Sequence, residues 1–171
     1  MHLFARFIGV PWAIIGVSVL LLRAIMGLSK HAANAIESGL STWQWIALVA
    51  FALFMLVAEG YRGFQKKFSP RTAARVKHLR DHPTLLRIVL APLFSMGFFH
   101  ANRKTKTIAY CLTFGIICLV LLVHQCDQPW RGIIDFGVVL GLTWGLISFW
   151  IFTIQALTNK DFSQSPEMPS A

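Results

Sequence analysis

The chain has 171 residues, of which 56% are apolar and only 13% are charged, and its mean hydropathy is +0.60. Soluble domains average about 45–50% apolar and about 25% charged residues, and a soluble fold of roughly 150 residues still leaves about 30% of its surface in water. These values exclude an ordinary soluble enzyme, a disordered chain and a disulfide-rich secreted domain. The 16 Lys and Arg residues outnumber the 7 Asp and Glu residues. We therefore predict an all-α integral membrane protein with a strongly basic region.

The first two predicted transmembrane helices cover residues 7–28 and 43–64. Each holds about 20 mostly apolar residues, enough for an α-helix to cross a hydrocarbon core of about 30 Å. The first is uncharged until Arg23. A cleaved signal peptide is the alternative for this segment, because the small residues at 33–35 resemble a cleavage site. The long and charged gap before them favours a retained span.

Residues 63–106, between the second and third spans, form the predicted cytoplasmic basic segment. Ser69 and Pro70 predict the start of a helix, since serine caps helices and proline suits the first turn, and Pro83 predicts its end. We expect this amphipathic helix to lie on the membrane, where anionic headgroups attract cations. The residues predicted to dock anionic lipid or a partner are Lys66, Lys67, Arg71, Arg75, Lys77 and Arg80.

Three interpretations of this basic segment remain open at this stage. It can be an anchor that keeps positive charge on the cytoplasmic side, a specific surface for lipid headgroups or a protein, or a nucleic-acid surface. The sequence contains no nucleic-acid-binding motif, and membrane topology explains nearly all of the charge. We therefore expect no nucleic-acid partner.

A shorter apolar stretch, residues 85–101, follows within the same segment, and Thr84 predicts the start of its helix. The uncharged residues 88–99 would form a helix of about 18 Å, which is too short to cross. Arg87 would cost about 2.5–3.5 kcal/mol at the centre of the bilayer. We predict a helical segment that is interfacial or re-entrant.

The third and fourth transmembrane helices are predicted at residues 107–123 and 133–157. The link between them is short, so they form an antiparallel hairpin. The four spans and the basic segment make one membrane domain, residues 1–158, and residues 159–171 are predicted to be a disordered cytoplasmic tail.

Glycines recur every four residues on the fourth span, at Gly137, Gly141 and Gly145. A stripe without side chains lets another membrane helix approach closely. Span one or span three of the same chain can fill this stripe, or a second subunit can. Gly9, Ala13 and Gly16 make a smaller face on span one, and we regard that face as a candidate mate.

Basic residues set the predicted orientation. Eleven of the 16 Lys and Arg residues lie between Arg62 and Lys106, and such residues are retained in the cytoplasm. With that segment inside, four spans also place Arg6 and Lys160 inside. We therefore predict that both termini lie in the cytoplasm. The compact polytopic form, without a transit-like N-terminus, leads us to expect a bacterial inner membrane.

Two acidic residues near span ends are candidates for an ion or substrate path, because ionisable groups inside a membrane are costly and often functional. Glu59 is expected to pair with Arg62, one turn away. Asp135 is expected to pair with Arg131 and to lie in the first turn of its helix, where a negative charge suits the dipole. Structural pairing is the simpler interpretation of both.

The histidines and cysteines do not predict a cofactor. No two histidines lie in register within the predicted spans, and His78 and His82 lack the further ligands that a metal site needs. Cys111 and Cys118 share one face of the third span and are expected to be small buried hydrophobic residues. We predict no metal and no cofactor.

The sequence contains none of the common catalytic motifs. The leading hypothesis is a non-enzymatic multi-pass membrane protein that acts as an accessory, assembly or scaffold component. The alternative is a small oligomeric transporter or channel, with Glu59, Asp135 or Arg87 along its path. A second alternative is a membrane enzyme that acts on lipid at the cytoplasmic face through His100. The expected partners are the lipid bilayer and either further copies of the chain or a larger membrane complex.

Overall fold

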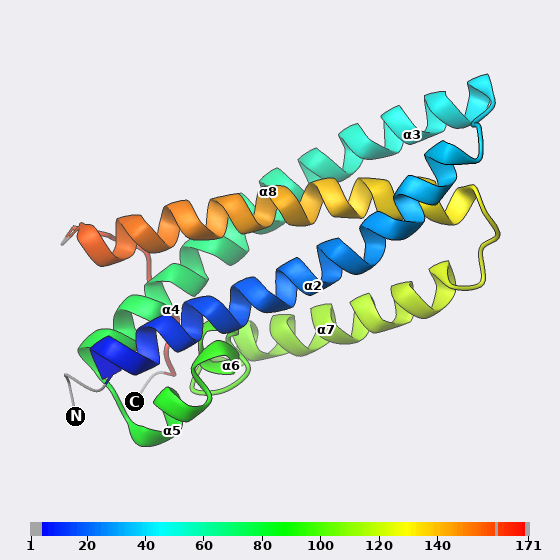
Figure 1. Ribbon diagram of the computed structural model, residues 1–171. Helices are drawn as coiled ribbons and strands as arrows, with labels where there is room; N and C mark the ends of the chain where they lie inside the picture. Colours follow the sequence, from blue (N-terminus) through cyan, green and yellow to red (C-terminus); the bar gives the residue numbers. More distant parts are fainter. Residues whose placement is uncertain (1–4, 160, 170–171) are drawn as a thin grey trace.

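The computed structural model describes residues 5–159 and 161–169, and every element in this part of the chain is helical (Figure 1). Lys160 and the last two residues of the predicted tail lie outside the described residues. Four helices within them are long and apolar enough to cross a membrane: Phe7–Glu37, Thr42–Asp81, Arg103–Val123 and Trp130–Thr158. The prediction of an all-helical chain with four candidate spans is confirmed.

The first long helix consists of η1 (Ala5–Gly9) and α2 (Val10–Glu37), and it extends well past the predicted end of span one. It ends at a turn in which Gly39 adopts a φ of 82°, a left-handed conformation that costs glycine little. After the turn, the Ser41 amide donates to Gln44 Oε1 at 2.8 Å, which satisfies one of the free amides at the start of α3 (Thr42–Met55).

The second long helix continues without a break from α3 through η2 (Leu56–Phe68) and α4 (Ser69–Asp81). The predicted helix start at Ser69 is therefore wrong, since Ser69 has helical dihedral angles of −62° and −47°. Its amide bonds to the carbonyl of Phe64, five residues earlier, and these wider π turns accommodate Pro70. The helix does end ahead of Pro83, as predicted. α4 is therefore part of the second long helix and packs against α8, so the prediction of a separate helix is wrong.

Two short helices, α5 (Leu85–Val89) and α6 (Ala91–Met96), occupy the stretch predicted to be interfacial or re-entrant. Thr84 Oγ1 accepts from the Arg87 amide at 3.4 Å, which confirms the second predicted helix start. Gly97 ends α6 with a φ of 93°. Neither helix is long enough to cross a bilayer.

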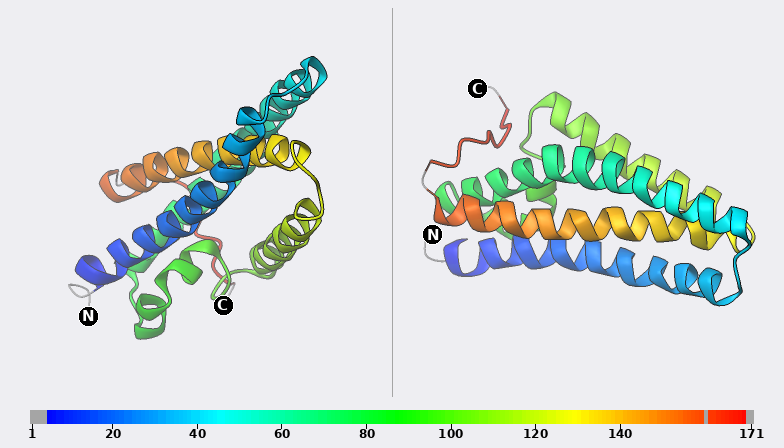
Figure 2. Two further views of the ribbon diagram at one scale, coloured as in Figure 1. Left: turned by 45° about the vertical axis from the view of Figure 1, so that its right-hand side comes forward. Right: turned by 90° about the horizontal axis from the view of Figure 1, so that it is seen from above.

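The last two long helices are α7 (Arg103–Val123) and α8 (Trp130–Thr158). Asn102 Oδ1 caps α7 by accepting from the Thr105 amide at 2.8 Å. α8 is the central helix and packs against α2 on one side and against α3, η2 and α4 on the other. α7 stands apart from these helices along most of its length (Figures 1 and 2).

The described ends of the chain, the end of α4, and α5 and α6 gather at one end of the bundle, and both long-helix turns lie at the other (Figure 1). The hydrophobic core at the first end contains Val10, Ala13, Val76, Leu79, Ile88, Ala91 and Phe94. This core joins α2, α4, α5 and α6. It holds the short helices against the long ones.

The tail after α8 turns back onto this end of the bundle, which differs from the free tail that we expected. The Asn102 amide donates to the carbonyl of Glu167 at 2.9 Å. The Glu167 carboxylate accepts from the Thr105 hydroxyl and lies 3.8 Å from the Arg71 guanidinium. Residues 166–168 are therefore held by specific polar contacts.

Candidate functional site

The glycine stripe of α8 faces the second long helix of the same chain. Added Cβ atoms at Gly137 and Gly145 would come within 2.6 Å of Phe51 and 2.5 Å of Phe64, respectively, and one at Gly141 would come within 3.0 Å of Glu59 Oε2. Real Cβ atoms do not approach other atoms as closely as at Gly137 and Gly145, and the approach at Gly141 is tight, so a side chain of the second long helix packs against each glycine. The close approach predicted for this stripe is found within the chain.

The helix that fills the stripe is different from the one we predicted. We expected span one or span three, with Gly9, Ala13 and Gly16 as a candidate mate on span one. Gly9 instead faces Ile88, and Gly16 faces Pro92 of α6. The small face of span one therefore packs against α5 and α6. The α8 stripe packs against span two instead.

Glu59 lies in this helix contact, and its predicted partner does not reach it. Its Oε2 atom is buried, and no hydrogen-bond partner for it occurs among the described residues. Arg62 is exposed, and the expected pair with Glu59 is wrong because the π turns of η2 rotate the two side chains onto different faces. Across the same contact, Gly60 makes room for Trp144, with 3.1 Å between an added Cβ and the Trp144 side chain.

Asp135 belongs to a second polar cluster, at the opposite end of the bundle from the tail. Its carboxylate lies 3.9 Å from Arg131 Nε, which confirms the predicted pair. Arg131 Nη2 donates to His31 Nε2 at 3.0 Å and to His124 Nε2 at 3.2 Å. Asp135 is the sixth residue of α8, so its predicted place in the first turn is wrong. The cluster joins the ends of α2, α7 and α8.

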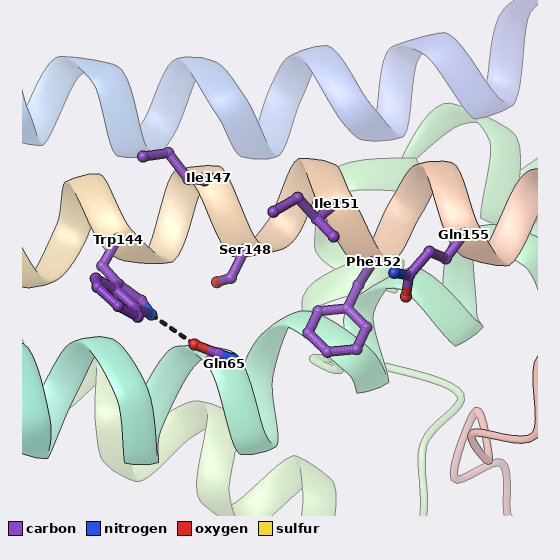
Figure 3. A pocket seen from close by; sticks show the side chains of 7 residues that line it. All are labelled: Gln65, Trp144, Ile147, Ser148, Ile151, Phe152 and Gln155. Atoms are coloured by element: carbon purple, nitrogen blue, oxygen red, sulfur yellow. Dashed lines mark hydrogen bonds between the residues drawn. The ribbon is translucent and has the colours of Figure 1, made fainter.

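A partly open groove of about 440 Å³ lies between η2 and α8 (Figure 3). Trp144 Nε1 donates to Gln65 Oε1 at 2.8 Å across its mouth, and Ser148 Oγ bonds to Ser69 Oγ at 2.9 Å beneath it. The lining residues are Gln65, Trp144, Ile147, Ser148, Ile151, Phe152 and Gln155. None of them titrates near neutral pH, so the lining offers no general acid or base. Sequence analysis did not identify this groove, because its residues come from two helices far apart in the chain.

The six cations predicted to dock lipid or a partner do not form one surface. Lys66 and Lys67 are exposed, and Lys66 Nζ lies 4.6 Å from the centre of the Tyr61 ring. Lys77 donates to the carbonyl of Asn159 at 3.2 Å, and Arg80 to that of Leu157 at 3.0 Å. These last two cations stabilise the end of α8, where carbonyls accumulate negative charge.

Arg75 is buried, with 0% relative exposure, so its predicted docking role is wrong. Its guanidinium donates to four backbone carbonyls, at distances of 2.7 to 3.1 Å: those of Phe94, Phe99, His100 and Pro166. A buried guanidinium needs such acceptors. Arg75 therefore holds α6, the turn before α7 and the tail against α4.

The side chains of α7 meet few neighbours. Leu112 is 55% exposed and Phe114 is 70% exposed, and residues two apart lie on nearly opposite sides of an α-helix. Gly115 has no atom of another residue within 4 Å of an added Cβ. Cys111 is exposed and Cys118 is partly exposed, so the expectation that both are buried is wrong within this chain. With Gly115 they form a stripe of small residues, which we call the α7 stripe.

Among the described residues, no group of three or more His, Cys, Asp or Glu side chains could hold a metal ion. Comparison with known protein families, with curated proteins and with solved structures finds no match for this chain. Its function must therefore be inferred from the geometry above.

Proposed function

We propose that this chain is a non-enzymatic multi-pass protein of a bacterial inner membrane, and that it acts as an accessory or assembly component of a larger membrane complex. α7 is the helix that binds the partner. The observation that carries this proposal is the contrast between α7, which stands apart with its small residues open, and the closely packed α8 (Figure 2).

The physical argument starts from how membrane helices associate. Lipid tails are as apolar as leucine, so helices pair through close van der Waals packing rather than through apolar burial. Small residues at a spacing of four, such as Cys111 and Gly115, allow that packing. Among the described residues, no helix packs closely against the α7 stripe. A transmembrane helix of another protein would fill it.

Charge favours a different protein over a second copy of this chain. The first turn of α7 carries Arg103, Lys104 and Lys106. A symmetric pair of parallel α7 helices would bring six like charges together, and like charges in contact suppress pairing. The preferred partner is an apolar helix with acidic residues at the end that meets this turn.

The orientation within the proposal follows the basic residues. The end of the bundle that holds α4, α5, α6 and the start of α7 also holds most of the Lys and Arg residues, and such residues face the cytoplasm. Lys66 and Lys67 remain candidates for contact with anionic headgroups there. A reporter fused after Lys106 tests this orientation, and an external signal would contradict it.

Purification in a mild detergent tests the partner. The full chain is compared with Gly115→Leu, which fills the α7 stripe, and with Gly27→Leu. Gly27 also has no atom within 4 Å of an added Cβ, so this variant is a matched control on another helix. We expect a co-purifying membrane protein that is retained by Gly27→Leu and lost with Gly115→Leu. Equal recovery with both variants would contradict the proposal.

A transporter is the second candidate, and the unpartnered Glu59 carboxylate is the observation that favours it. A buried acid next to the α8 stripe resembles the intramembrane acids of proton relays. Reconstituted vesicles test this candidate. Proton or ion flux that is abolished by Glu59→Gln would support it, and equal flux with both proteins would contradict it.

A further inference from the structure

Two imidazoles, those of His78 and His100, contact Arg87 at the end of α4, outside the sites described above. Arg87 Nε donates to His100 Nδ1 at 3.3 Å, and its Nη1 donates to His78 Nε2 at 3.4 Å and to the carbonyl of His82 at 3.0 Å. The rings of His78 and His82 stack with 4.6 Å between their centres. α4, α5 and the turn before α7 each contribute to this cluster, which we call the Arg87 cluster.

The Arg87 cluster has a second cation beside it and no carboxylate within it. Arg75 and Arg87 both contact the Phe94 ring, at 4.3 and 5.4 Å from its centre. The nearest acids are engaged elsewhere: Asp81 pairs with Arg80 at 2.8 Å, and Glu167 lies against Arg71. Among the described residues, no carboxylate forms an ion pair with Arg87, so positive charge is in excess at this cluster.

This excess of positive charge affects the histidine that faces it. Burial, together with the charges of Arg87, Lys106 and Arg75, holds the pKa of His100 below its ordinary value of 6.5. Burial also lowers the pKa of Arg87. An anion placed among these groups would relieve the repulsion between the positive charges.

Arg87 has a donor available for such an anion. Two of its three nitrogens make the bonds given above, and Nη2 makes no hydrogen bond to any described residue. The side chain is partly exposed. A guanidinium with a free edge, next to imidazoles, provides the charge-assisted donors that a phosphate oxygen accepts.

The surroundings of the cluster indicate the source of the phosphate. α5 buries Ile88 in the core and presents Leu85, Leu86 and Val89 outwards, with exposures of 71%, 53% and 61%. Trp12 Nε1 donates to the carbonyl of Val89 at 3.1 Å. Tryptophan beside exposed aliphatic side chains is typical of the bilayer interface. A lipid headgroup fits this position better than a free ion does.

We propose that the Arg87 cluster binds the phosphate of an anionic phospholipid, with Arg87 as the main donor, His78 and His100 as supporting donors, and α5 in the acyl-chain region. This site is independent of the partner proposed for α7. It also differs from the docking surface expected from the sequence, since Arg87, His78 and His100 are not among those six cations.

Lipid binding to the full chain in detergent micelles tests the proposal. Phosphatidylglycerol and phosphatidylcholine, each dissolved in the same detergent, are compared by titration, and inorganic phosphate is added as a competitor. We expect tighter binding to phosphatidylglycerol, weakened about tenfold by Arg87→Gln through loss of a charge-assisted contact. Lys104→Gln is the matched control, because Lys104 is an exposed cation at the same end of the molecule. It should bind like the unaltered chain.

The competitor separates the two sources of phosphate. Displacement only by high phosphate concentrations would support a headgroup site, and displacement of the lipid at low concentrations would assign the site to free phosphate. Equal losses for Arg87→Gln and Lys104→Gln would overturn the proposal, because nonspecific charge would then explain the binding. Arg87→Lys keeps the charge but loses the planar fork. Full affinity in that variant would also overturn the assignment of Arg87 as the main donor.

Discussion

Two helices of this chain carry small residues at helical spacing and have opposite surroundings. On α8, a side chain of the second long helix packs against each of the three glycines, Gly137, Gly141 and Gly145. On α7, a Cβ added at Gly115 would meet no atom within 4 Å among the described residues. The difference teaches that a small-residue stripe specifies close approach but does not specify what approaches. In α8 the chain supplies the neighbour, and in α7 we infer that another protein does.

The largest expected effect is that of Gly141→Leu. The new side chain would displace Glu59 and separate α8 from η2, and overpacking of this kind costs about 3 kcal/mol. We expect a strongly lowered melting temperature in detergent and aggregation on size-exclusion chromatography. Gly27→Leu, on an open face of α2, is the control. If the Gly141→Leu protein has the same melting temperature as the unaltered chain, close packing at the α8 stripe is not needed for stability, and the contrast with α7 is contradicted.

Charge reversal at the start of α7 is expected to have the next largest effect. Arg103→Glu combined with Lys104→Glu should leave the fold intact, because both side chains are exposed. It should weaken capture of the proposed partner several-fold, by about 1–2 kcal/mol, since each exposed ion pair contributes at most about 1 kcal/mol. Quantitative recovery of the partner at two salt concentrations measures this. Unchanged recovery would contradict the acidic partner.

Removal of the Glu59 charge is expected to change the stability of the protein by a smaller amount, and to increase it. Glu59→Gln keeps the size of the side chain beside Gly141 while removing a buried charge that has no partner among the described residues. We expect an increase in stability of about 1 kcal/mol, because an unpaired buried charge is costly. Thermal unfolding in detergent measures this. A decrease would indicate that the carboxylate makes a favourable contact.

The smallest effect concerns His100 and the first turn of α7. The pKa of His100 is lowered, so the folded state favours the neutral imidazole. The unfolded chain takes up a proton as the pH falls through about 6.5, and stability therefore decreases below that pH. Lys106→Gln removes one cause and should raise the pKa of His100 in an NMR titration. An unchanged pKa would show that Lys106 does not act on it.

Much of the fold follows from local sequence signals. Four long apolar segments predict the four candidate spans, Pro83 predicts the end of α4, and Thr84 predicts the start of α5. These succeed because length, hydropathy and capping act within a few residues. The missed helix continuation at Ser69 has a local cause as well, since serine and proline are common at helix starts but do not exclude π turns.

The candidate sites were less predictable, because they depend on contacts between distant segments. The charge of Arg75 predicts an exposed basic surface, whereas backbone carbonyls from α6 and the tail surround it. The sequence pairs Glu59 with its neighbour Arg62, although packing against the α8 stripe determines the position of Glu59. The partner of a glycine stripe cannot be predicted from the glycines, since they contribute no side chain to recognise it.

Photo-crosslinking from α7 tests the central claim most directly. In a chain whose three cysteines are changed to serine, a thiol-reactive benzophenone is attached in intact membranes at Leu119→Cys, an exposed position beside the α7 stripe. Val49→Cys in the same background carries the label on the exposed side of α3. We predict one protein adduct from position 119 that is absent from position 49 and lost with Gly115→Leu. Lipid adducts alone at both positions, or an adduct of twice 19.2 kDa, would contradict a separate protein as the partner of α7.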